Sequence, residues 1–202
     1  MFSKRQKIYL SIKRIFDVTL STAFIVILSP LLLTLWIFSA IDSKGKPIFV
    51  QKRIGKNQIC FNIYKFRSMK TTTPSKGAEY LTEEESQSLT TRWGRFMRKT
   101  SLDELPQLFN ILKGDMSFIG PRPGLTKEGE AELIQYRSSY LPSAYEVKPG
   151  LSGYSQVTLK RGHDVRERAR WDSFYVKHLS FFLDQKLFFI SVFAVFGINR
   201  GK

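Results

Sequence analysis

The longest hydrophobic run of the chain extends from Val18 to Ile41 and contains no charged residue. Because about 20 apolar residues span the hydrocarbon core of a bilayer, this length is typical of a membrane-embedded helix. Residues 1–17 mix basic and large apolar side chains, which is typical of an amphipathic segment on an anionic membrane surface. A cleaved signal peptide is the alternative, but the run is long and lacks a convincing small-residue cleavage site.

Ser29 and Pro30 interrupt this run near its centre. Proline removes a helical hydrogen bond and kinks the helix, and a neighbouring serine can cover the freed carbonyl within lipid. Basic residues flank the run on both sides, and such flanks tend to stay in the cytoplasm. We therefore favour a re-entrant helix, broken at Ser29-Pro30 and returning to the same face, over a helix that crosses the bilayer.

Alternating apolar and polar residues from Pro47 to Met69 predict a β-hairpin that turns at residues 55–57. Lys65 and Arg67 alternate with apolar residues in its second strand, so they share one face. Such pairs are most often solvated, and facing a phosphate is the functional alternative. Residues 70–90 are polar and poor in large aliphatic residues, which predicts a mobile surface segment or lid.

The downstream pattern is mainly helical. Residues 127–140 predict a solvent-facing helix, and residues 147–157 predict turns followed by an extended segment. A dense basic run at 160–170 is most typical of a solvated helix face. The uncharged part of the tail, 187–198, is too short to span a bilayer, so we expect it to pack on the domain or lie in the membrane interface.

The pattern as a whole predicts an α+β, mostly helical fold, with a membrane segment at 1–42 and a single cytosolic domain at 43–202. The 32 Lys and Arg residues against 17 Asp and Glu give a net charge of +15, which needs an anionic partner or surface. Nucleic acid and anionic lipid are the two candidates. The single cysteine excludes an internal disulfide, and the two histidines lack the spacing of a zinc site. The sequence contains no Gly-rich phosphate loop and no serine-nucleophile elbow.

The strongest candidate chemistry lies between Thr100 and Pro123. Two adjacent carboxylates, Asp103 and Glu104, precede an apolar helical pattern, and Arg122 lies between two prolines that fix the neighbouring backbone. An acid pair, a rigidly held arginine and a basic approach from residues 92–99 together indicate chemistry on an anion, above all a phosphate.

A structural explanation competes with this interpretation, because Ser101 to Glu104 fits a helix capping box. In such a helix Pro106 would lie past the first turn and would cost a hydrogen bond. A helix that begins later would leave the acid pair in the turn that precedes it. Both alternatives place the acids at the positive end of a helix, a natural phosphate site.

Four motifs occur in a fixed order: the helix broken at Ser29-Pro30, YKFRSM at 64–69, SLDELPQLFNILKGDMSFIGPRP at 101–123, and KPGLSG at 148–153. In these motifs the chain resembles the monotopic phosphoglycosyl transferases, the bacterial sugar-transferase family that initiates lipid-linked glycan assembly. The similarity covers roughly residues 13–186, and its central motif is long enough to be highly specific. The chain looks like a minimal member, with little beyond the catalytic core.

The resemblance implies that Asp103 is the nucleophile, that Glu104 holds Mg²⁺ and that Arg122 binds phosphate. Members commonly continue the pair Gln156-Val157 with Asn-Gly-Arg, whereas here Thr158-Leu159-Lys160 follows. Lys160 keeps the charge but not the planar fork of arginine, which puts the nucleotide or sugar contacts of this loop in doubt. The family also carries a basic residue at the position of Lys65 and an acid at the position of Asp184. The complete set of candidate residues is Asp103, Glu104, Arg122, Lys65, Arg67, Lys160, Gln156 and Asp184, with Ser29 and Pro30 at the helix break.

The implied activity is transfer of a sugar-1-phosphate from a UDP-sugar to polyprenyl (undecaprenyl) phosphate, releasing UMP through a covalent aspartyl intermediate. This would be the first membrane step in the assembly of a bacterial capsule, O-antigen, exopolysaccharide or glycoprotein, at the cytoplasmic membrane. The implied cofactor is Mg²⁺, and anionic membrane lipid is a further partner. The sequence leaves open whether the protein forms a homo-oligomer. A transferase that releases UDP is the rival among enzymes. A non-enzymatic, membrane-tethered binding module for nucleic acid or acidic polymer is the rival outside them, allowed by the charge but supported by no nucleic-acid motif.

Overall fold

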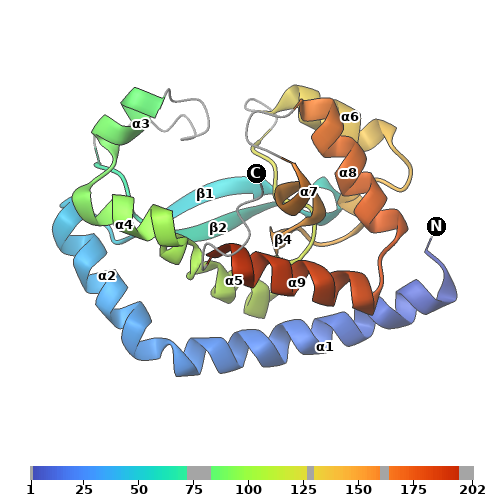
Figure 1. Cartoon of the computed structure of the whole chain (residues 1–202), viewed down its shortest axis with the longest axis horizontal. Helices are drawn as coiled ribbons and strands as arrows, with labels where there is room; N and C mark the ends of the chain where they lie inside the picture. The colour runs from blue at the N-terminus through green and yellow to red at the C-terminus, as the bar shows by residue number, and fades with distance from the viewer. Residues whose placement is uncertain (1, 72–82, 127–129, 160–163, 196–202) are drawn as a thin grey trace.

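The computed structural model describes residues 2–71, 83–126, 130–159 and 164–195. Two helices, α1 (Lys4–Ile27) and α2 (Ser29–Ser43), form a bent arm along the outside of the domain (Figure 1). They meet at an angle of 68°, and within the described ranges neither helix alone has the length and apolarity of a membrane span, whereas the bent pair together has both.

The predicted break at Ser29-Pro30 is confirmed. Pro30 falls in the first turn of α2, where its missing N–H removes no helical hydrogen bond. Ser29 Oγ donates to the carbonyl of Val26 at 2.8 Å, which covers an acceptor at the end of α1. Exposed apolar residues continue across the bend, with Ile27 at 70% and Ile41 at 69% of full exposure.

The arm is fastened to the domain by polar contacts from α1. Arg14 donates to the carbonyls of Ile111 and Leu112 at 2.7 and 2.8 Å. Buried Asp17 accepts from the hydroxyl of Ser117 and from the backbone N–H of Phe118, at 3.0 and 3.1 Å. The inward face of α1 is therefore fixed by directional contacts as well as by apolar packing.

The predicted hairpin and the position of its turn are confirmed. Strand β1 (Ile48–Ile54) pairs antiparallel with β2 (Cys60–Phe66), and the short helix η1 (Lys56–Gln58) makes the turn between them. A second small sheet pairs β3 (Ser117–Ile119) in parallel with β4 (Gly150–Ser152). The predicted α+β, mostly helical fold is thus confirmed.

Helices surround these sheets and close the core. They are α3 (Glu83–Leu89), α4 (Arg92–Thr100), η3 (Leu102–Glu104), α5 (Gln107–Lys113), α6 (Ala131–Ser139), η4 (Ala144–Glu146), α7 (Tyr154–Thr158), α8 (Val165–Lys177) and α9 (Phe181–Val195). Their apolar faces meet in a core that includes Ile63, Leu108, Ile111, Met116, Val176 and Leu187. Helix α9 lies beside α1 in Figure 1, so the described part of the tail packs on the domain as predicted.

Structural detail is added to one sequence-based expectation, and two others need correction. Within the polar segment 70–90, residues 83–89 form helix α3, and residues 72–82 lie outside the described ranges. Residues 147–157, expected to hold turns and then an extended segment, contain the short strand β4 and then helix α7, in which Tyr154 and Val157 pack on the core at helical spacing. Helix α6 is not wholly solvent-facing, since Leu133 and Arg137 are both 1% exposed.

Candidate functional site

The acid pair lies in η3, a single turn between α4 and α5. Ser101 ends α4 in the left-handed conformation at φ 58°, and its side chain makes no capping hydrogen bond, so the capping box does not form. Helix α5 begins at Gln107 with Pro106 as its N-cap residue. The alternative in which the helix begins after the proline is therefore confirmed, and it leaves Asp103 and Glu104 in the preceding turn.

Glu104 is held by two basic side chains. Its Oε1 accepts from Lys65 Nζ at 2.7 Å and lies 4.0 Å from Arg122 Nη1. Burial raises the pKa of Glu104, but Lys65 and Arg122 outweigh it, so the pKa of this carboxyl lies below its usual range. Glu104 is consequently ionised throughout the physiological pH range.

Asp103 responds in the opposite direction, although it is the adjacent residue. It is only 9% exposed, and burial, with the charge of Glu104, raises its pKa to about 6. Lys65 lowers this value only in part. Two neighbouring carboxyl groups whose pKa values are pushed apart in this way are typical of paired carboxyls with different chemical roles.

Arg122 enters the site from a segment, residues 121–123, that contains two prolines and is packed closely on its neighbours. The carbonyl of Pro121 accepts from Gly150 N–H at 3.0 Å, and the chain then pairs with β1 where Ile54 N–H donates to Gly124 at 2.9 Å. A side chain on Gly150 would place its Cβ 2.1 Å from the backbone nitrogen of Gly120, so this approach requires glycine.

A small cleft joins Glu104, Lys65 and Arg122. Its lining comes from the hairpin, η3, α5, the segment 121–123 and β4. The residues that line it are Arg53, Ile63, Lys65, Glu104, Gln107, Arg122, Pro123, Gly150 and Leu151. Carboxylate and cationic side chains around one concave surface fit an anionic ligand that also brings a cation.

Of the other predicted residues, Arg67 and Gln156 are not among those that line the cleft. Arg67 donates to the carbonyl of Lys46 at 2.7 Å, and its guanidinium lies over the ring of Phe49. Phe49 is the cross-strand partner of Lys65, so Arg67 and Lys65 lie on the same face of the hairpin, as predicted. Gln156 lies on α7, and its Oε1 is buried without a hydrogen-bond partner in the described part of the chain. Lys160 lies outside the described residues.

Asp184 lies in a separate buried cluster. Its Oδ2 accepts from Tyr9 Oη and Lys13 Nζ, each at 2.5 Å, and its Oδ1 accepts from Tyr175 Oη at 2.8 Å. These contacts join α1, α8 and α9, so in this structure Asp184 fastens the bent arm to the domain.

Arg53 was not among the residues predicted from the sequence, although the predicted hairpin pattern places it on the same face as Lys65. In the hairpin register Arg53 pairs with Phe61, and Phe49 pairs with Lys65, so Arg53 and Lys65 lie on one face. Arg53 is 6% exposed and lines the cleft. The basic run at 160–170 was also misjudged in part. Arg166 and Arg170 are exposed as predicted, but Arg168 pairs with Glu130 at 3.1 Å.

The donor set fits a hard divalent cation only in part. In the described ranges, no three potential ligands from His, Cys, Asp and Glu lie together. Magnesium, however, often takes one or two protein carboxylates and completes its shell with phosphate oxygens and water. Glu104 uses Oε1 for its basic partners, and Asp103 lies beside it. Glu104 therefore fits an ion that it would share with a phosphate ligand.

The fold and the site together define a small α+β protein on a bent apolar helix pair, with a cleft suited to phosphate chemistry. Residues 8–197 match the bacterial sugar transferase family. The chain belongs to this family, and the assignment made from its sequence motifs is confirmed.

Over the aligned residues, curated relatives are a little more than a third identical to the chain. An undecaprenyl-phosphate glucose phosphotransferase of Komagataeibacter xylinus is 37% identical, over 89% of this chain and 35% of its own length. A UDP-glucose:undecaprenyl-phosphate glucose-1-phosphate transferase of Escherichia coli K12 is 35% identical, over 94% of this chain and 41% of its own length. The chain thus spans less than half of these two relatives. An uncharacterized sugar transferase, EpsL, of Bacillus subtilis is 36% identical, and 85% of its length is matched.

Proposed function

We propose that this protein transfers a sugar-1-phosphate from a UDP-sugar to undecaprenyl phosphate and releases UMP. The observation that carries the proposal is the acid pair: Asp103 is buried and has a raised pKa, and the adjacent Glu104 has a lowered pKa and lines a cleft with Lys65 and Arg122. Family membership and the names of the relatives support the same activity.

Asp103 is the proposed nucleophile. A carboxylate oxygen of Asp103 forms a bond to the phosphorus that bears the sugar, the bond from that phosphorus to the bridging oxygen breaks, and UMP leaves with the electron pair. An oxygen of undecaprenyl phosphate then attacks the same phosphorus, and the carboxylate of Asp103 leaves unchanged. A pKa of about 6 leaves Asp103 ionised at neutral pH and makes it more basic than an ordinary aspartate.

The basic residues of the cleft have a separate task. The diphosphate of the donor repels an approaching carboxylate, and Arg122 can offset its charge with a planar pair of donors. Lys65 fixes Glu104 at 2.7 Å and so keeps the second acid ionised and oriented. Glu104 would hold Mg²⁺ together with phosphate oxygens of the donor, and the ion would neutralise phosphate charge and orient the diphosphate.

The bent arm suits a lipid acceptor. Helices α1 and α2 expose apolar side chains on both sides of the 68° bend. Both helices of the pair also connect to the domain, through Arg14 on α1 and through Ser39 on α2, which donates to the carbonyl of Pro47 at 3.0 Å. We place this pair in the cytoplasmic membrane as a re-entrant anchor, with the cleft on the cytosolic side beside anionic lipid.

The test uses the full chain in lipid nanodiscs with undecaprenyl phosphate, Mg²⁺ and a panel of UDP-sugars, and it measures UMP and UDP separately. We expect one donor to give UMP in amounts equal to the lipid-linked sugar formed, and Asp103→Asn to give none. Release of UDP would show a glycosyl transferase. No nucleotide release with any donor, together with tight binding of nucleic acid or acidic polymer, would favour the binding module.

A further inference from the structure

The segment that carries Arg122, residues 121–123, is bound to three neighbouring elements through its carbonyl groups. Pro121 and Pro123 have no N–H, so this segment cannot pair along its length as a strand. Instead, its three successive carbonyls accept from three different elements. Pro121 accepts from Gly150 of β4 at 3.0 Å, Pro123 from Arg53 of β1 at 3.4 Å, and Arg122 from Arg137 of α6 at 2.9 Å.

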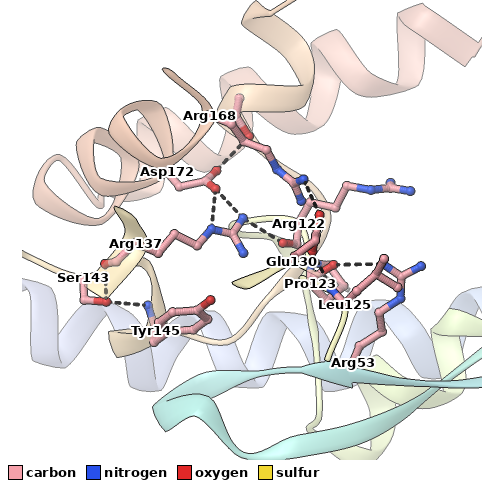
Figure 2. Close-up of polar contacts among 11 residues, drawn as sticks. Arg53, Arg122, Pro123, Leu125, Glu130, Arg137, Ser143, Tyr145, Arg168 and Asp172 are labelled. Atoms are coloured by element: carbon pink, nitrogen blue, oxygen red, sulfur yellow. Dashed lines mark hydrogen bonds and ion pairs between the residues drawn. The ribbon is translucent and has the colours of Figure 1, made fainter. Parts of the chain in front are cut away.

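The contact from Arg137 is the most deeply buried of the three. Arg137 is 1% exposed, and Figure 2 shows its guanidinium lying between Asp172 and the segment that carries Arg122. Nε donates to Asp172 Oδ2 at 2.9 Å, and Nη2 donates both to that oxygen and to the carbonyl of Arg122. One nitrogen thus links the carboxylate to the backbone of the candidate phosphate-binding residue.

Asp172 extends the connection to a further element. It is fully buried on α8, and its Oδ1 accepts from Ser155 Oγ of α7 at 2.7 Å. Residue 156, a candidate from the sequence, follows Ser155 directly on α7. One buried carboxylate therefore connects α6, α7 and α8 behind the cleft.

Stability alone is a weak reason for such a pair, because a buried ion pair is often no more stable than apolar residues of the same volume. Its distinctive property is geometric: a planar guanidinium can hold two acceptors at a fixed angle, and a lysine ammonium cannot. We infer that Arg137, oriented by Asp172, is a positioning residue that sets where the Arg122 side chain enters the cleft. The catalytic consequence of this inference rests on the proposed function.

A second contact secures the chain just beyond this segment. Glu130 accepts from Leu125 N–H through Oε2 and from Arg168 of α8 through Oε1. Glu130 thus secures residue 125, whereas Arg137 donates to the carbonyl of Arg122 itself. Arg137 is therefore the residue to change.

The test replaces both members of the pair, as Arg137→Met with Asp172→Asn, so that no buried charge is left alone and Ser155 keeps an acceptor. Ser173→Ala is the matched control: it removes a hydrogen bond of 2.8 Å from the next residue of α8 to the carbonyl of Pro142, away from the cleft. Hydrogen exchange of residues 118–125 is measured first. We expect faster exchange in the double variant, no change in Ser173→Ala, and cooperative unfolding in both.

Enzyme kinetics then separate positioning from general weakening. The double variant should lower kcat/KM for the donor by roughly 10- to 100-fold, because small misplacements of a binding group have effects of this size. In an Arg122→Ala background the same change should cost less than about threefold, since its target is already gone. Losses that simply multiply would overturn the inference.

Failure of the inference and failure of the proposed function can be told apart. Unchanged exchange at 118–125 in the folded double variant would overturn the inference even if the protein is an active transferase. Faster exchange with no nucleotide release by the unmodified protein would overturn the proposed function and leave Arg137 as the residue that fixes this segment. Should the double variant fail to fold, Arg137→Lys, which keeps the charge, is measured in the same two ways.

Discussion

Asp103 and Glu104 are adjacent in the chain, yet their surroundings give them opposite tendencies to hold a proton. Glu104 faces Lys65 and Arg122, whereas burial dominates at Asp103. The difference arises because η3 is a single turn that sends one carboxyl toward the hairpin and leaves the other in the packed interior. Two residues of similar chemistry thus acquire different roles from their position in one short turn.

The assignment of Asp103 as nucleophile predicts a covalent adduct. Incubation with a sugar-labelled donor and no lipid acceptor should leave label on Asp103, detected by mass spectrometry after quenching. Asp103→Asn should lose the adduct and lower turnover by roughly three orders of magnitude or more, because it removes the attacking charge at constant shape. Asp115→Asn, at the end of α5 and outside the cleft, is the control. Turnover that needs both substrates before UMP leaves, with no adduct, would instead indicate direct attack by the lipid.

The raised pKa of Asp103 also predicts how stability depends on pH. Folding raises this pKa from 3.8 to about 6, so the folded protein favours the protonated form. Asp103 therefore contributes most to stability below pH 3.8, and this contribution is lost as the pH rises toward 6. Asp103→Asn should be more stable than the unmodified protein at pH 7.5, by on the order of 1–3 kcal/mol.

Thermal unfolding at two pH values measures this difference. The advantage of Asp103→Asn should shrink markedly at pH 4, where the unmodified residue is itself protonated in the fold. An equal advantage at both pH values would show that the gain comes from packing, and that burial does not raise the pKa of Asp103.

At Arg122 the prediction concerns shape at constant charge. Arg122→Lys should lower kcat/KM for the donor by about 10- to 100-fold, because one ammonium replaces a planar fork that can hold two phosphate oxygens. Fold and membrane association should persist, as measured by circular dichroism and by flotation with vesicles. Near-normal turnover would mean that residue 122 acts only through its backbone.

Among the helices and strands, sequence patterns correctly predicted those features that depend on residues close together in the chain. Alternation in 48–66 predicted the hairpin, and Pro106 predicted the late start of α5, because each depends on rules that operate within a few residues. The pair Arg137–Asp172 was not predicted, because its members lie far apart in the chain and are brought together only when α6 packs on α8. In the same way Arg168 looked solvated until Glu130 was known to lie beside it.

The bend between α1 and α2 predicts a topology that a single substitution should disturb. Pro30→Leu allows the helix to continue, so part of the population should adopt a spanning arrangement in cells. The measurement labels a cysteine introduced at Ser3 with an impermeant thiol reagent, and peptide mapping reports native, exposed Cys60 in the same sample. In the protein that carries this cysteine and keeps Pro30, neither position 3 nor Cys60 should be labelled from outside the cell. Labelling at position 3 without the substitution would contradict the re-entrant arrangement.

For the whole molecule, the charge of +15 and the apolar arm predict two separable contributions to membrane binding. Vesicles with anionic lipid should bind the protein more tightly than neutral vesicles at low salt, because basic residues near the surface are attracted to the headgroups. At about 1 M salt, where screening extends only a few ångströms, this preference should vanish while binding to both persists. Complete release at high salt would show that the arm does not insert.

The bent arm is attached to the domain at two points. The first is Arg14 with Asp17 on α1, and the second is Ser39 on α2, whose hydroxyl also donates to the carbonyl of Arg67 at 2.8 Å. Between them the chain crosses the bend with a fixed number of residues. One inserted residue would rotate the helix beyond the insertion by about 100° and lengthen it by about 1.5 Å, so the contacts at one of the two points would be lost. The contacts of Asp17 and Ser39 therefore fix the number of residues between them, although many of those residues are exposed.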